Sequence, residues 1–287
     1  VWGGIQQLKY MQTLTDHLSD KKVAALSRDL AAIRDLVITK ENLKVGLVGE
    51  TGDLQESLGL LSNGGPLAGV SAVVPGNAGF TMPPVSLEHA PVREGWSTSS
   101  AVSFVAKTIR TVRMEHADSP ALAVISKMLR SMYLHREIRE KGGAYGGFAL
   151  YSSETGLFNF ASYRDPHILS TLAAFEGAAE FILSGNYTQE DIKEAILQVC
   201  SEIDKPDPPG PAAKKAFYRG LVNLTDDARR RFKEQLLDLK HADILAAGQT
   251  YFSQGNHEQG VAVISGEDRL KKANETIAGP PLEINKI

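Results

Sequence analysis

The sequence is poor in the residues that cross-link a chain or bind metals. It has one cysteine, Cys200, and seven histidines. One cysteine excludes an internal disulfide framework and fits a reducing compartment. Cys200 follows apolar residues at helical spacing, so we expect it to be a core residue and not a nucleophile. No two histidines have the spacing His-x-x-Glu-His or His-Glu-x-x-His, which places two ligands on one helix face, so the sequence predicts no metal site in this chain.

The sequence also lacks a strong charge and any long apolar run. Lys and Arg total 31 against 34 Asp and Glu, for a formal net charge of -3, and the basic residues are scattered. We therefore expect neither a nucleic-acid partner nor a membrane partner. Hydrophobic residues make up 43% of the chain, enough for a substantial core. Because nothing indicates export, we expect a bacterial cytoplasmic protein, with the mitochondrial matrix or a plastid as the alternative if it is eukaryotic.

The first 61 residues predict a helical hairpin followed by a strand. Residues 5–38 contain two apolar stripes at helical spacing, which predict two helices with Ser19 as a cap between them. Alternating apolar residues predict a strand over 42–49, and a short helix is expected over 53–61.

Residues 62–96 have the composition of an inter-domain connection. They contain six glycines and five prolines, which cannot sustain long regular elements. Apolar residues such as Val73 and Phe80 indicate that this segment packs along a domain surface instead of forming a free linker.

Residues 97–287 predict a second, larger domain that mixes strands and helices. We expect a hairpin around Gly156, because two alternating segments flank it. The predicted strands cover 102–113, 144–151, 157–163 and 260–264, and the predicted helices start near 119 and 166 or cover 188–202, 212–221, 225–238 and 241–253. This order predicts an α+β fold, a two-layer sandwich of a mainly antiparallel sheet covered on one face by helices.

The segment SYRDP, residues 162–166, is interpreted as a helix start. We expect Asp165 to accept hydrogen bonds from helix amides and Pro166 to occupy the first turn. Arg164 is expected to pair with a neighbouring carboxylate.

A charged helix end runs into a glycine-rich segment at residues 134–147. Apolar residues at helical spacing precede it, Gly142 and Gly143 are expected to end the helix, and a strand follows. Arg139 and Tyr145 lie six residues apart across this turn, which can aim a guanidinium and a phenol into the same space. On residue types alone, an alternative stays open: Arg139 pairs with a neighbouring glutamate and Tyr145 is an ordinary strand aromatic.

Several segments carry a family resemblance. They are REIREKGGAYGG at 136–147, HADSPALAVISKML at 116–129, SYRDP at 162–166, WGG at 2–4, IDKPDPPG at 203–210 and AVISG at 262–266. Together they make the chain resemble the C-terminal half of presequence-protease-type zinc metallopeptidases of the pitrilysin and insulinase group. The resemblance spans essentially the whole chain. It implies a domain like those of pitrilysin and mitochondrial processing peptidase, preceded in residues 1–61 by the tail of a related domain.

The resemblance also implies a function, and it implies which parts of the enzyme bind zinc and substrate. In the full-length enzyme zinc is bound by an N-terminal domain that this chain lacks, so this chain holds no cofactor and is expected to be inactive alone. Arg139 and Tyr145 match the pair that contacts the substrate and stabilises the transition state, and Gly142, Gly143 and Gly146 would let a peptide backbone pass. The implied partners are unfolded peptides, degraded in a closed chamber, and the N-terminal zinc-bearing half. The alternative is a non-catalytic partner or structural subunit that pairs with a separate zinc-bearing chain.

Overall fold

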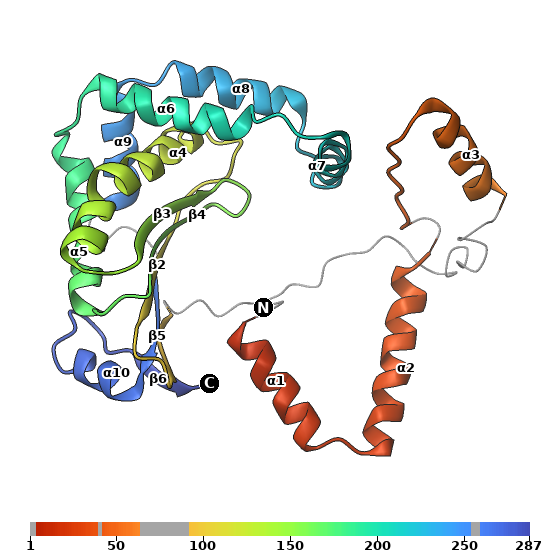
Figure 1. Ribbon diagram of the computed structural model, residues 1–287, viewed down its shortest axis with the longest axis horizontal. Helices are drawn as coiled ribbons and strands as arrows, with labels where there is room; N and C mark the ends of the chain where they lie inside the picture. Colours follow the sequence, from red (N-terminus) through yellow and green to blue (C-terminus); the bar gives the residue numbers. More distant parts are fainter. Residues whose placement is uncertain (1–3, 40–41, 64–91, 254–258) are drawn as a thin grey trace. The chain divides into compact units, whose positions relative to one another are not determined.

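The computed structural model describes residues 4–39, 42–63, 92–253 and 259–287 (Figure 1). The chain divides into two compact units, one made of residues 1–87 and 207–223 and the other of residues 88–206 and 224–287. Most of the predicted connection at 62–96 lies outside the described residues, so the predicted division of the chain stays a prediction. Within the described ranges, no helix is both long and apolar enough to cross a membrane.

Most described residues of the first unit are helical. Ser19 caps its second helix by accepting a hydrogen bond from the Lys22 amide at 3.4 Å, as predicted. None of its helices buries a residue completely, and Leu8 and Leu30 are 62% and 64% exposed. The helices are α1 (Ile5–Asp16), α2 (Asp20–Val37), α3 (Thr51–Ser62) and α7 (Pro209–Leu221).

The prediction of a strand over residues 42–49 is wrong. These residues form no strand in the structure, and Leu43, Val45 and Leu47 are all exposed. A strand needs a neighbour to pair its backbone amides and carbonyls, and alternation in sequence cannot reveal whether that neighbour exists.

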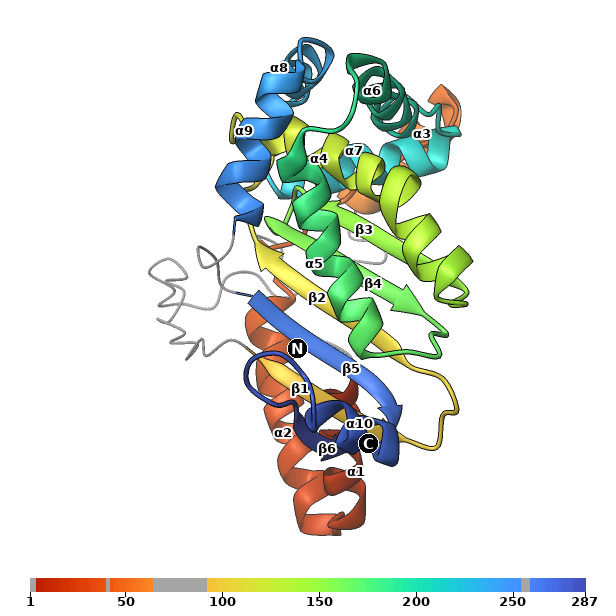
Figure 2. The ribbon, with the colours of Figure 1, turned by 90° about the vertical axis from the view of Figure 1, so that its left-hand side faces the viewer.

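The second unit is built on one six-stranded sheet (Figure 2). Its strands are β1 (Arg93–Thr98), β2 (Phe104–Arg110), β3 (Gly146–Ser152), β4 (Leu157–Tyr163), β5 (Gln259–Gly266) and β6 (Glu283–Lys286), in the order β3-β4-β2-β5-β1-β6. The pairs from β3 to β5 are antiparallel, whereas β1 is parallel to both β5 and β6. The predicted mainly antiparallel α+β fold is confirmed. The sequence did not predict β6, and β1 begins within the segment expected to be a connection.

Helices cover one face of this sheet (Figures 1 and 2). Four of them contact its strands: α4 (Ser119–Met128), the π-helix η1 (Leu129–Lys141), α5 (Leu169–Ser184) and α10 (Glu267–Asn274). Three more pack on α4 or α5: α6 (Gln189–Ile203), α8 (Asp226–Leu237) and α9 (His241–Phe252). The predicted helices are thus present, with α10 as an unpredicted addition after β5.

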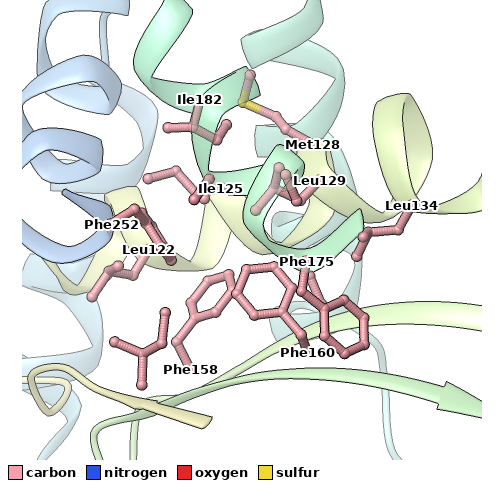
Figure 3. Close-up of a cluster of buried hydrophobic side chains, with 14 of the residues drawn as sticks. Leu122, Ile125, Met128, Leu129, Leu134, Phe158, Phe160, Phe175, Ile182 and Phe252 are labelled. Carbon is pink, nitrogen blue, oxygen red and sulfur yellow. The ribbon is translucent and has the colours of Figure 1, made fainter. Parts of the chain in front are cut away.

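The core lies between the sheet and these helices (Figure 3). Phe158 and Phe160 of β4 and Phe175 of α5 are completely buried, and the rings of Phe160 and Phe175 stack with centroids 5.4 Å apart. Complete burial of such a side chain contributes about 1.5–3 kcal/mol. Cys200 is partly buried against this core, as expected, and burial raises the pKa of its thiol.

The opposite face of the sheet carries the other side chains of each strand. Because side chains alternate along a strand, the burial of Phe158 and Phe160 on the helix side places Tyr163 on the open side. The burial of Val105 and Ile109 places Phe104 there in the same way. Leu150 and Tyr163 are 49% and 43% exposed. The open face therefore presents apolar and aromatic groups to solvent.

The two predicted helix starts differ from the structure in detail. Asp118 precedes α4, but its carboxylate accepts the Tyr251 hydroxyl at 2.8 Å instead of capping the helix. Asp165 is buried and accepts the His167 amide at 2.8 Å and the Thr171 hydroxyl at 2.7 Å. It does not cap α5, which begins only at Leu169, because an isolated antiparallel bridge to Ser103 holds Asp165 in extended pairing.

Candidate functional site

Arg139 lies in the last turn of η1. The sequence predicted an α-helix here, but the wider π-helical winding runs from Leu129 to Lys141. Near its start, the Ser131 hydroxyl donates to the Lys127 carbonyl at 3.0 Å, a contact that competes with the regular backbone pattern. Such wide turns are rare and occur often at functional sites.

Two glycines are needed to end η1. Gly142 has no room for a side chain, because a Cβ would lie 2.6 Å from the Ile138 carbonyl oxygen. Gly143 has a φ of 72°, a left-handed conformation that favours glycine, and its amide donates to the Arg139 carbonyl at 3.0 Å. The predicted helix end is confirmed, and its geometry explains why both positions are occupied by glycine.

The side chain of Arg139 is left without a partner. Glu137 accepts from Arg136 and Lys141, both at 2.9 Å, and Glu140 pairs with His135 at 3.3 Å. The Lys141 hydrogen bond is the largest cause that lowers the pKa of Glu137. Arg139 is exposed and forms no side-chain hydrogen bond or ion pair with any described residue. The alternative in which Arg139 merely pairs with a neighbouring glutamate is therefore not what the structure has.

Tyr145 lies just before β3 and is 69% exposed. Its amide donates to the Tyr163 carbonyl at 3.1 Å, which ties it to the end of β4. Its ring meets the Tyr163 ring edge to face at 5.8 Å, and Tyr163 meets Phe104 in the same way at 5.4 Å. The Tyr145 hydroxyl has no hydrogen-bond partner among the described residues, so both candidate donors point to the outside of this unit.

Gly147 brings η1 close to β3. A Cβ at this position would lie 2.9 Å from the Cβ of Ile138, closer than ordinary contact. Ile138 precedes Arg139 directly, so this contact sets the position of the arginine relative to the strand that follows Tyr145. The structure thus places the two predicted site residues at either end of one turn, between η1 and β3.

The segment at 162–166 meets this turn. Pro166 lies 3.9 Å from the position where a Cβ of Gly143 would be. Arg164 does not pair with a carboxylate as predicted: its guanidinium carbon lies 5.7 Å from the centroid of the Tyr163 ring. The sequence reasoning missed Tyr163, although the register of the predicted hairpin, with Gly146 opposite Tyr163, is the signal that could have found it.

The site is an open surface. A cavity of about 590 Å³ beside it is lined by Gly142, His167 and eight other residues, but not by Arg139 or Tyr145. Across the described part of the chain, no three His, Cys, Asp or Glu side chains are grouped to hold a metal ion. The described residues therefore do not fit the zinc that the family resemblance implies.

The family model described as PreP C-terminal domain matches residues 97–267. "Presequence protease, mitochondrial" of Xenopus tropicalis is 38% identical over 174 residues, covering 61% of this chain and 17% of its own length. The chain thus spans about a sixth of that relative.

Two bacterial proteins of known structure share this fold. A protease from Helicobacter pylori has a TM-score of 0.54 at 16% identity, covering 76% of this chain and 53% of its own. A peptidase M16 inactive domain from Pseudomonas fluorescens has a TM-score of 0.52 at 16% identity, covering 82% and 53%. At this identity the likeness shows the fold, and it agrees with the predicted α+β sandwich.

Proposed function

The chain belongs to the PreP C-terminal domain family, as its resemblance predicted, and we propose that it forms the substrate-binding side of a zinc metalloendopeptidase that degrades unfolded peptides in a closed chamber. The observation that carries this proposal is that Arg139 and Tyr145, six residues apart across one turn, are both exposed, with a guanidinium that pairs with no described residue. The N–H groups of Arg139 are therefore available to a ligand.

Arg139 and Tyr145 supply hydrogen-bond donors to the substrate. Arginine stays charged at every relevant pH and presents a fork of N–H groups, and tyrosine adds a directional hydroxyl. Donors of this kind stabilise the negative charge that develops on the carbonyl oxygen during peptide hydrolysis, and loss of one costs on the order of 100-fold in turnover. Of the three glycines expected to let a peptide backbone pass, Gly143 is exposed and keeps that proposed role, whereas a Cβ on Gly142 or Gly146 would meet Ile138 or Phe148.

Zinc belongs to the other half of the proposed enzyme. In this proposal the present chain binds and orients the peptide and donates hydrogen bonds to it. The open surface at Arg139 and Tyr145 supports this division, because a chamber needs a second wall. We propose that the N-terminal zinc-bearing half supplies that wall.

The compartment follows from the relatives. The names of the curated relatives from Xenopus tropicalis and Kluyveromyces lactis include the word mitochondrial. This favours the mitochondrial matrix over the bacterial cytoplasm that the sequence suggested, and over a plastid. Import of a tagged full-length protein into isolated mitochondria tests this placement.

The experiment is a cleavage assay on an unstructured fluorogenic peptide. We expect no cleavage by this chain alone and chelator-sensitive cleavage after it is mixed with a separately expressed N-terminal half. Cleavage by this chain alone, or none after mixing, would contradict the proposal. The reading frame upstream of residue 1 separates the two assignments: a His-x-x-Glu-His motif there supports a single-chain enzyme, and a start codon near residue 1 supports a separate partner subunit.

A further inference from the structure

We propose that Arg164 binds a carboxylate of the peptide, either an acidic side chain or the C-terminus, as a specificity-determining contact beside Tyr145. This inference rests on the proposed function, because it assigns part of the peptide to the same surface. It concerns a residue that the family-derived pair of Arg139 and Tyr145 does not include.

The first observation is the position of the Arg164 side chain. It is exposed, and its guanidinium carbon lies 5.7 Å from the centroid of the Tyr163 ring. That ring also contacts the ring of Tyr145 at 5.8 Å. Tyr163 therefore contacts both the ring of Tyr145, whose phenol is the proposed hydrogen-bond donor, and the guanidinium of Arg164. This places Tyr145 and Arg164 on the same patch. A guanidinium against an aromatic ring is held in place while its N–H groups remain free to bind.

The second observation is the backbone of Arg164. Its φ is 50°, and Asn223 is the other residue besides glycine with a positive φ in the described ranges. Asparagine tolerates this left-handed conformation, but arginine is strained in it. Backbone hydrogen bonds of the residues on both sides keep Arg164 in this strained conformation. The Tyr163 carbonyl accepts the Tyr145 amide at 3.1 Å, and Asp165 and Ser103 exchange backbone hydrogen bonds at 2.7 and 2.8 Å.

Such strain points to a use for the side chain. Glycine would fit this backbone without strain, so stability alone favours glycine at position 164. A long charged side chain that is kept in a strained conformation and is exposed is not explained by packing. The one contact that the described residues give this side chain is the ring of Tyr163, which leaves its N–H groups open to a ligand.

The charges around the patch point to an anionic ligand. Arg139 and Arg164 form no ion pair with any described residue, whereas Glu137, Glu140 and Asp165 are all occupied by other donors. The guanidinium groups of Arg139 and Arg164 therefore keep N–H donors that no described carboxylate accepts. In a peptide, the group that matches a guanidinium fork is a carboxylate, bound through two parallel hydrogen bonds.

The test is binding of fluorescently labelled peptides to this chain, measured by anisotropy. Three peptides share one sequence: one with a glutamate and a free C-terminus, one with the glutamate changed to glutamine, and one amidated at the C-terminus. We expect Arg164→Gly to weaken binding of the first peptide by about tenfold, the effect of losing one charged hydrogen bond. The effect should vanish for whichever modified peptide lacks the carboxylate that Arg164 binds.

Asn223→Gly is the matched control, because it makes the same change at the other left-handed position. We expect it to leave peptide binding unchanged. Arg164→Gly should keep or raise the melting temperature, since it relieves strain, so a loss of binding cannot be blamed on unfolding.

The outcomes distinguish a failure of this inference from a failure of the proposed function on which it rests. If Arg139→Ala and Tyr145→Phe weaken peptide binding but Arg164→Gly does not, the inference fails and the proposed function stands. If Arg164→Gly weakens all three peptides equally, its role is structural and the inference is wrong. If the wild-type chain binds none of the peptides, the proposed function and the inference fail together.

Discussion

Gly147→Ala tests whether the contact between η1 and β3 positions the site. The new methyl group would lie 2.9 Å from Ile138 Cβ, 3.0 Å from its Cδ1 and 3.2 Å from its Cγ2. Ordinary contacts begin at 3.4 Å, so helix and strand must separate by about half an ångström. The Ile138 Cβ is fixed to the backbone and cannot rotate away. Overpacking of this kind costs about 1–3 kcal/mol, of which the lower chain entropy of alanine in the unfolded state offsets about 0.5–1 kcal/mol.

The assay is urea unfolding followed by circular dichroism, with Gly260→Ala as the control. Gly260 also lies in a strand, but among the described residues a Cβ there would meet only the Val92 carbonyl oxygen, at 3.7 Å. We expect Gly147→Ala to lower the free energy of unfolding by about 1–2 kcal/mol and Gly260→Ala to change it by less than about 0.5 kcal/mol. Equal effects of the two variants would refute the reasoning.

A second variant identifies the clashing partner. Ile138→Ala removes the Cγ2 and Cδ1 atoms that the new methyl meets, so the cost of adding that methyl should fall in the Ile138→Ala background. The expected coupling is at least about 0.5 kcal/mol in a double-mutant cycle. If the two substitutions change the free energy of unfolding by strictly additive amounts, the methyl group added at position 147 does not clash with the Ile138 side chain.

Three further predictions concern α6. Thr188 accepts the Asp191 amide and Asp191 accepts the Thr188 amide, so Thr188→Ala should cost about 1 kcal/mol in urea unfolding. Those hydrogen bonds from Thr188 lower the pKa of Asp191, so the stability that its carboxylate contributes is present at neutral pH and is lost as pH falls below about 4. The stability gap between wild type and Asp191→Asn should therefore narrow in acid. Burial raises the pKa of Cys200, so iodoacetamide should alkylate it more slowly at pH 8 than it alkylates free cysteine, and faster alkylation would contradict its burial.

The hairpin and the helix end could be predicted from sequence because local residues determine them. Gly156 adopts a φ of 71° at the turn between β3 and β4, and Gly143 adopts a φ of 72° after η1. Both conformations favour glycine strongly, so the residue type itself marks the position. Alternation of apolar residues on either side then identified the strands.

Other features depend on partners that sequence patterns do not show. The four residues of β6, Glu283–Lys286, have no apolar alternation and exist as a strand through parallel pairing with β1. The π-helical winding of η1 was missed because apolar spacing predicts the common 3.6-residue period. Arg164 was expected to pair with a carboxylate, and its contact with the ring of Tyr163 accompanies a left-handed backbone that its residue type does not predict.

The most direct test of the central claim is the turnover of a saturating peptide by the mixed halves carrying Arg139→Ala. Arg136→Ala is the matched control, since it removes an arginine from the same helix that is paired with Glu137. The account predicts that Arg139→Ala, and Tyr145→Phe in parallel, lower kcat on the order of 100-fold while Arg136→Ala leaves it within about twofold. Wild-type turnover by the Arg139→Ala and Tyr145→Phe variants would leave the fold assignment intact and contradict the proposed roles of both residues.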